Sequence, residues 1–307
     1  MSNYINILRP ANLLIIAISQ GLIYFMFIIP QFETYGIPRL LDDQLIFLFI
    51  GVTVLIAAGS YIINDIKDST ADFINKPDKC FVGETKLSPR TGYIYYISTI
   101  LAGAILAVYI AFSIKKPLLF IIYPFAVALL FMYSHSWKRS PLSGNIIVAI
   151  FCAFVPAIIW YAESEGMNAL QLVNPHIVLL FSMYICFGFL ATLAREIIKD
   201  LEDIEGDRAA GYQTFPISAG VERAKMLAIF TSIILISSYG LWILALIRLE
   251  YWISLTALVA ALVLPSIYIL KIINRAKSKT DFSNLSKYCK YLLLASLIIF
   301  IIILLEI

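Results

Sequence analysis

Long apolar stretches dominate the chain and are separated by short polar segments. Crossing about 30 Å of hydrocarbon takes roughly 20 apolar residues as a helix, and lipid offers no partner for an unpaired backbone group. The pattern therefore predicts nine membrane-spanning helices, at residues 11–30, 45–63, 93–114, 117–133, 146–162, 177–198, 226–247, 252–270 and 288–305. Pro124, Pro156 and Pro265 fall inside these ranges, where we expect them to kink the helices and not to end them.

Composition narrows the class of protein further. Of the 307 residues, 61% are hydrophobic and only 14% are charged, whereas a soluble domain is roughly 45–50% apolar and about 25% charged. This excludes a soluble domain and a disordered chain. The four cysteines form no close pair, which argues against a disulfide framework. We expect one all-α integral membrane domain over residues 1–307.

Two further observations concern partners and processing. The net charge of +3 is too small to suggest a nucleic-acid partner. The first apolar stretch is too long for a cleaved signal peptide, and no Ala-x-Ala-like site follows it before Pro30. No obligate protein partner is evident.

Basic residues are distributed very unevenly between the two sides of the predicted bundle. The side that holds the N-terminus carries 18 Lys and Arg residues, the opposite side carries four, and Arg195 lies within the sixth helix. Cytoplasmic loops of membrane proteins are enriched in Lys and Arg. The asymmetry predicts a cell-membrane protein with a cytosolic N-terminus and an external C-terminus.

Acidic residues concentrate in two of the predicted cytosolic loops, each following an apolar helix. Both loops contain the pattern Asp-x-x-Asp-x-x-x-Asp, displaced by 135 residues, which suggests an internal repeat. The first is Asp65, Asp68 and Asp72, directly after Asn64, and the second is Asp200, Asp203 and Asp207.

Positions i, i+3 and i+7 share one face of a helix, so each pattern would display a stripe of carboxylates if its helix continued. Like charges at this spacing repel, and a divalent cation would relieve the repulsion. Carboxylate and amide oxygens suit Mg²⁺, whose remaining positions are filled by water and substrate phosphate oxygens. Two facing stripes therefore suggest a two-ion site for a diphosphate. The alternative is a solvated acidic loop balanced by nearby lysines.

Other metal sites fit the sequence poorly. Only two histidines, His135 and His176, are present for a catalytic zinc site. The Glu-x-x-His motif of di-iron bundles and the Asp-x-Asp-x-Asp-Gly motif of EF-hands are absent.

Basic residues near both patterns complete the argument for a phosphate ligand. Preplaced cations would stabilise a departing diphosphate, which gains charge as its bond breaks. The candidates are Arg9 with Asn12 at the start of the first helix, Lys79, Lys138 in the segment after Tyr133, and Arg195 with Lys199.

The chain resembles the UbiA superfamily of intramembrane prenyltransferases over nearly its whole length. The resemblance rests on Arg9-Pro10 near the start, on the aspartate motifs at 64–72 and 200–207, and on Tyr133-Ser134, Lys138 and Gly144-Asn145 between them. One departure lies after Asn75-Lys76-Pro77. Many members continue with Arg-Pro-Ile-Pro, whereas this chain reads Asp78-Lys79-Cys80-Phe81-Val82. The departure puts the quinone- and haem-making branches in doubt.

The resemblance implies a helical bundle around a central cavity open to the lipid, two Mg²⁺ ions, and a polyprenyl diphosphate donor within the membrane. It places Asn64, Asp68 and Asp72 on one ion and Asp200, Asp203 and Asp207 on the other, with Asp65 as a further candidate ligand. Asp68 and Asp203 would be essential for catalysis. The implied substrate-binding residues are Arg9, Asn12, Lys79, Tyr133, Lys138, Arg195 and Lys199.

The resemblance also implies a lipophilic acceptor, and the second motif is most similar to the branch that alkylates geranylgeranylglyceryl phosphate. That branch forms an ether lipid from geranylgeranyl diphosphate, and Arg195 could hold the acceptor phosphate. An alternative is an aromatic acceptor in quinone or chlorophyll-type synthesis. A distant alternative is an ion-coupled transporter, although transporters place ionisable groups near the membrane midplane and here they lie at helix ends.

Overall fold

The computed structural model describes residues 5–69, 73–74, 82 and 87–306. Its helices, in chain order, are α2 (Pro10–Ile23), η1 (Tyr24–Ile28), α3 (Ile29–Thr34), α4 (Asp43–Lys67), α6 (Pro89–Ser113), α7 (Leu118–His135), η3 (Trp137–Arg139), α8 (Ser143–Ala162), α9 (Ser164–Val173), α10 (Pro175–Glu202), α11 (Ile204–Ala209), α12 (Phe215–Ala219), α13 (Val221–Arg248), α14 (Trp252–Leu258), η4 (Val259–Val263), α15 (Leu264–Arg275) and α16 (Lys279–Glu306).

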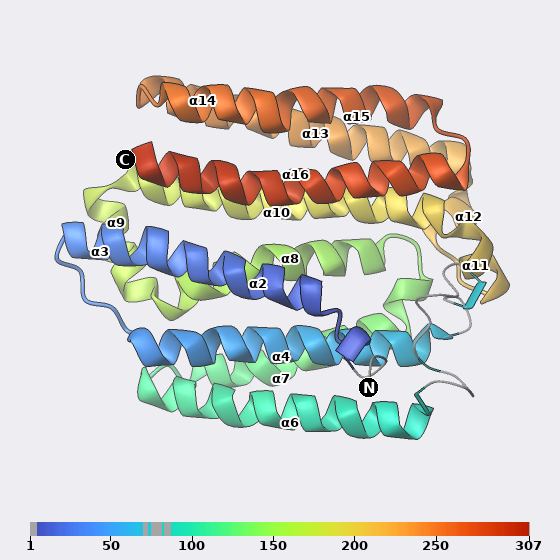
Figure 1. Ribbon diagram of the computed structural model, residues 1–307, viewed down its shortest axis with the longest axis horizontal. Helices are drawn as coiled ribbons and strands as arrows, with labels where there is room; N and C mark the ends of the chain where they lie inside the picture. Colours follow the sequence, from blue (N-terminus) through green and yellow to red (C-terminus); the bar gives the residue numbers. More distant parts are fainter. Residues whose placement is uncertain (1–4, 70–72, 75–81, 83–86, 307) are drawn as a thin grey trace.

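Within this described part, nine spans are long and apolar enough to cross a membrane, which confirms the predicted number. They are α2 to α3, α4, α6, α7 with η3, α8, α10, α13, α14 to α15, and α16. The long helices run alongside one another, and α16 finishes at the end of the bundle away from where α4 and α10 finish (Figure 1).

Prolines lie within the spans without ending them, and two of them follow a π-helical turn. Pro124 and Pro156 lie inside α7 and α8. Pro30 and Pro265 are the second residues of α3 and α15, which directly follow the five-residue π-helices η1 and η4. A proline lacks an amide hydrogen and its ring crowds the preceding turn, which a wider turn accommodates. The predicted end of the first helix at Pro30 is therefore wrong, because the span continues to Thr34.

The central helix of the bundle is α10, which packs against α8, α13 and α16. Half of its most apolar stretch is buried, against 22–33% in the other spans. The ring of Phe181 on α10 contacts the tilted ring of Phe27 of η1, with centroids 4.8 Å apart, and stacks on Phe300 of α16, with centroids 5.8 Å apart. Burying aromatic rings contributes strongly to packing, and these rings join the first, sixth and ninth spans.

Large apolar side chains cover the outside of the bundle. Ile105, Phe112 and Leu305, for example, are 70–74% exposed. Contiguous apolar surface of this extent is unfavourable in water but favourable in lipid. The chain is a multi-pass membrane protein.

At the end of the bundle opposite the aspartate motifs, a buried carboxylate fastens a loop. Glu163 accepts hydrogen bonds from the amides of Leu40 and Leu41, at 2.9 and 2.8 Å, and from the Tyr24 hydroxyl at 3.2 Å. These donors satisfy a charge that burial would otherwise disfavour. This acid is therefore structural and ties α8 to the loop after the first span.

Candidate active site

The described residues of both aspartate motifs lie at the same end of the bundle, where α4 and α10 end (Figure 1). The middle aspartate of each motif, Asp68 or Asp203, is the C-cap residue of its helix. Their backbones are nearly identical, with φ −96° and ψ 5° at Asp68 and φ −98° and ψ 7° at Asp203. The repeat seen in the sequence thus extends to the local backbone.

The break at each cap corrects one expectation. The sequence predicted one stripe of carboxylates on the condition that each helix continued through its motif. Instead α10 ends at Glu202 and the short helix α11 begins at Ile204. Asp200 and Asp207 therefore belong to different helices, and the turn at Asp203 decides how they face each other.

In the first motif, Asp65 is buried and bound by an arginine from the first span. Arg9 Nη2 lies 2.5 Å from Asp65 Oδ1, and the Arg9 guanidinium lies 5.0 Å from the centre of the Tyr61 ring. Asn12, on the first turn of α2, lies beside Tyr61. Two residues predicted to bind substrate are therefore next to the first motif.

Asp68 is held by two side chains from distant parts of the chain. It is only 1% exposed, and Lys138 Nζ donates to its Oδ2 atom. The Tyr212 hydroxyl donates to the Oδ1 atom at 3.0 Å. Burial and the charge of Asp68 raise the pKa of Tyr212 to about 12, so its hydroxyl keeps its proton at neutral pH.

Close packing at Gly144 fixes the turn that carries Lys138. A Cβ atom on Gly144 would lie 3.0 Å from the Lys138 Cα atom and 3.2 Å from the Trp137 carbonyl oxygen. A side chain there would force α8 away from η3. Glycine at this position allows the first turn of α8 to support the lysine.

The second motif is surrounded by polar groups of α8 and α10. Asp200 Oδ2 accepts a hydrogen bond from Asn145 Nδ2 at 2.9 Å. Glu196, which is 6% exposed, lies between two cations. Its carboxylate is 2.6 Å from Arg195 Nη1 and 3.3 Å from Lys199 Nζ.

A small polar pocket of about 30 Å³ lies between these elements. Its lining residues are Tyr133, Lys138, Gly144, Asn145, Glu196, Lys199, Asp200, Asp203, Asp207 and Thr214. It thus combines acidic side chains of the second motif with basic side chains from two different elements. Burial and, to a lesser extent, the neighbouring Asp203 carboxylate raise the pKa of Asp207 to about 6.

The donor set of this region fits Mg²⁺. Within the described residues no three His, Cys, Asp or Glu side chains are close enough together to hold a metal ion, and the carboxylates are paired with basic and amide groups. The Asn64 Oδ1 and Thr214 Oγ1 atoms are buried and find no hydrogen-bond partner in the same part of the chain. A cation beside Asn64, or a substrate oxygen beside Thr214, would satisfy them.

The structure brings most of the predicted site residues to one end of the bundle. Tyr133, Lys138, Lys199 and the second motif line the pocket. The end of α4 carries Asp65 and Asp68, and the start of the first span brings Arg9 and Asn12 beside it. Arg195 adjoins the pocket through Glu196. Asp72 and Lys79 lie outside the described residues. The opening of a cavity to the lipid stays a prediction.

Sequence reasoning did not select several residues that contribute to this site. Glu196 could have been found, because it precedes Lys199 by one helical turn and follows Arg195 directly. Asn145 was quoted only as part of the resemblance. Tyr212 and Thr214 carried no signal, since nothing in the local sequence relates them to the first motif.

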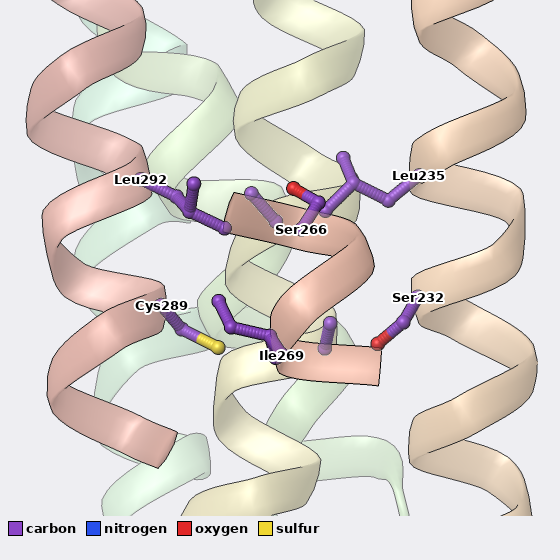
Figure 2. Close-up of a pocket in the computed structure, with 8 residues that line it drawn as sticks. Ser232, Leu235, Ser266, Ile269, Cys289 and Leu292 are labelled. Atoms are coloured by element: carbon purple, nitrogen blue, oxygen red, sulfur yellow. The ribbon is translucent and has the colours of Figure 1, made fainter. Parts of the chain in front are cut away.

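A second, smaller cavity lies between α10, α13, α15 and α16 (Figure 2). Its volume of about 10 Å³ is roughly the space of one water molecule. Its Ser232 hydroxyl bonds to the Ala228 carbonyl, and its Ser266 hydroxyl pairs with Tyr239. The lining contains none of the predicted site residues, so this cavity is a packing gap and not the substrate site.

The match to a known family covers almost the whole chain. The UbiA prenyltransferase family matches residues 12–297. The chain belongs to this family and is a membrane prenyltransferase. The resemblance inferred from the two aspartate motifs is confirmed, and the family assignment decides against the ion-coupled transporter.

Three relatives are similar to this chain over almost its whole length. Digeranylgeranylglyceryl phosphate synthase of Methanobrevibacter smithii is 29% identical over 303 residues, which are 98% of each chain. A solved structure described as digeranylgeranylglyceryl phosphate synthase in membranes has a TM-score of 0.67 and 22% identity, with 100% of this chain and 99% of that chain covered. A UbiA homologue from Archaeoglobus fulgidus bound to GPP and Mg²⁺ has a TM-score of 0.58 and 17% identity, with 97% and 99% covered.

Proposed function

We propose that this prenyltransferase moves a geranylgeranyl group from geranylgeranyl diphosphate to the free hydroxyl of geranylgeranylglyceryl phosphate and forms an ether lipid. The observation that carries the acceptor assignment is Arg195 beside the pocket. It adds a fixed positive charge to those of Lys138 and Lys199. A diphosphate donor and a phosphorylated acceptor together need this many cations, whereas a neutral aromatic acceptor leaves Arg195 without a substrate partner. The likeness to digeranylgeranylglyceryl phosphate synthases supports the same choice.

Magnesium would be held by the oxygen ligands at the ends of α4 and α10. The described candidates are Asn64, Asp65, Asp68, Asp200, Asp203 and Asp207, and Asp72 remains a predicted ligand from the sequence alone. When bound, the metal supplies a Lewis acid for the leaving diphosphate. Two ions are proposed because the motif occurs twice, with the same backbone conformation at Asp68 and Asp203.

The residues of the chain would then bind, orient and protect the substrates. Arg9, Lys138 and Lys199 neutralise diphosphate charge as the bond from carbon to the diphosphate oxygen breaks and its electron pair leaves with the diphosphate. The acceptor hydroxyl oxygen bonds to the allylic carbon and gives its proton to the departed diphosphate. Apolar walls below the polar pocket would exclude water, which would otherwise capture the carbocation.

Arg195 tests the acceptor assignment. In the Arg195→Ala variant we expect the KM for geranylgeranylglyceryl phosphate to rise roughly 10–100-fold, because a charge-assisted contact of about 1.5–3 kcal/mol is lost. The KM for the donor should change by less than about threefold, since Lys138 and Lys199 remain. Steady-state kinetics with each substrate varied in turn would measure both values.

A matched control is Arg223→Ala, because Arg223 is exposed on the first turn of α13. It should leave both KM values unchanged. If Arg195→Ala weakened donor binding and left acceptor binding intact, Arg195 would belong to the diphosphate site. Assays with an aromatic acceptor would then be expected to show turnover.

The proposed orientation places both aspartate motifs in the cytosol. Cysteines introduced by Ser69→Cys or Glu205→Cys, in a background without Cys80, Cys152, Cys186 and Cys289, should react with an impermeant thiol reagent only from the cytosolic face. Leu172 is 86% exposed on α9 at the other end of the bundle, so Leu172→Cys should react only from outside. Labelling of Ser69→Cys or Glu205→Cys from outside would contradict the orientation.

A further inference from the structure

A tight turn after the second motif returns the chain toward the first motif. The Tyr212 amide donates to the Asp207 carbonyl at 2.8 Å, and the Gly211 amide donates to the Arg208 carbonyl at 3.1 Å. This pair of bonds is the Schellman pattern that closes many helices. Gly211 has φ +76°, a conformation that glycine adopts without steric cost. The end of α11 therefore fixes where the backbone of Tyr212 lies.

The side chain of Tyr212 reaches from this turn to the first motif. It is 4% exposed, and its hydroxyl donates to Asp68 Oδ1 at 3.0 Å. The Arg139 guanidinium lies over its ring at 5.1 Å from the centroid, and the Gln213 amide donates to the Arg139 carbonyl at 2.8 Å. Ring and backbone are thus both held against η3.

The helix η3 also supplies the hydrogen-bond donor to the other carboxylate oxygen of Asp68, Oδ2. Lys138, the residue before Arg139, donates to Asp68 Oδ2. One carboxylate is therefore oriented on both sides by groups whose backbones are bonded to each other through Gln213 and Arg139. A carboxylate held in this way cannot rotate freely about its last bond. Partners of this kind orient metal ligands, and their loss typically costs about 10–100-fold in metal affinity or activity.

We propose that Tyr212 is a positioning residue that couples the two aspartate motifs. Its backbone is bonded to Asp207 of the second motif, and its hydroxyl is bonded to Asp68 of the first. It thereby fixes the Asp207 backbone relative to the Asp68 carboxylate, and both aspartates would bind the magnesium that holds the diphosphate. The inference rests on the proposed magnesium site and adds a residue that neither aspartate motif contains.

The test is Tyr212→Phe, which removes one hydroxyl and keeps the ring beneath Arg139 and the backbone turn. Binding of Mn²⁺, as a paramagnetic substitute for Mg²⁺, would be measured by electron paramagnetic resonance on the purified full chain in detergent without substrate. We expect Mn²⁺ to bind roughly tenfold more weakly than to the wild type. The kcat measured with Mg²⁺ should fall by a similar factor, while the thermal unfolding midpoint stays the same.

A control variant separates positioning from a general loss of a buried hydroxyl. Tyr239 is 1% exposed and its hydroxyl pairs with Ser266 at 3.0 Å, away from both motifs. Tyr239→Phe should leave Mn²⁺ binding unchanged. If Tyr212→Phe bound Mn²⁺ as tightly as the wild type does, the coupling role would be overturned while the magnesium site would stand. A wild-type protein that bound no Mn²⁺ would overturn the magnesium site and, with it, the coupling role.

Discussion

Removal of divalent metal by excess EDTA is expected to abolish prenyl transfer, and added Mg²⁺ is expected to restore it. Asp65, Asp68, Asp200, Asp203 and Asp207 lie at the end of the bundle where we propose that the diphosphate binds. The cations available there already face carboxylates, since Arg9 pairs with Asp65 and Lys138 pairs with Asp68. A diphosphate approaching without metal would meet net repulsion. The leaving group would also lose several kcal/mol of stabilisation, equivalent to a rate loss on the order of 10³-fold or more.

The measurement is product formation from a labelled prenyl diphosphate by the purified protein in detergent or in liposomes. A parallel sample with EDTA already saturated with Mg²⁺ controls for effects of the chelator itself and should keep full activity. Undiminished turnover in excess free EDTA would refute a metal-dependent site.

Loss of either helix-capping aspartate should be nearly as severe. We expect Asp68→Asn and Asp203→Asn each to lower kcat/KM by roughly 10²–10⁴-fold, because each removes a charged ligand from a site that stabilises developing negative charge. Both residues are C-caps with φ near −97°. Asparagine tolerates such backbone positions well, so the fold should persist.

The control for these variants is Asp43→Asn at the opposite end of the bundle. Asp43 pairs with Arg39 at 3.1 Å, and its side chain is 75% exposed. Exposed pairs contribute little to stability, so this change should affect neither activity nor folding. If Asp68→Asn and Asp203→Asn kept wild-type kcat/KM and Asp43→Asn did too, the aspartates would serve structure and not catalysis.

The sequence showed that the two motifs are equivalent, but it did not predict the backbone conformation at the end of each helix. Apolar periodicity places α4 and α10 well, because each must cross the same thickness of lipid. It does not locate the last hydrogen-bonded turn, which depends on the capping residue and its tertiary partners. For that reason the bend at Asp203 and the separate helix α11 were not predicted.

In the first and eighth spans, the sequence likewise predicted the helices but not the backbone conformation around their prolines. Their apolar content predicted both helices, and a proline in an apolar run predicted a bend at Pro265. Whether a proline ends a helix or bends it depends on the packing of the residues around it. In the first span, Tyr24 and Phe27 are fully buried within the π-helical turn η1, and the helix continues past Pro30.

By itself, the sequence determined the class of the protein and the number of membrane spans in its described part, and it placed two groups of acidic residues at helix ends. Those properties depend on the length of apolar runs, on the balance of charge across the membrane and on residues close together in the chain. The tertiary structure decided which groups hold each carboxylate. Lys138 and Tyr212 lie 70 and 144 residues from Asp68, and no local pattern links them. They meet because α4, η3 and the end of α11 pack at the same end of one bundle, and packing of this kind depends on the shapes of all the helices together.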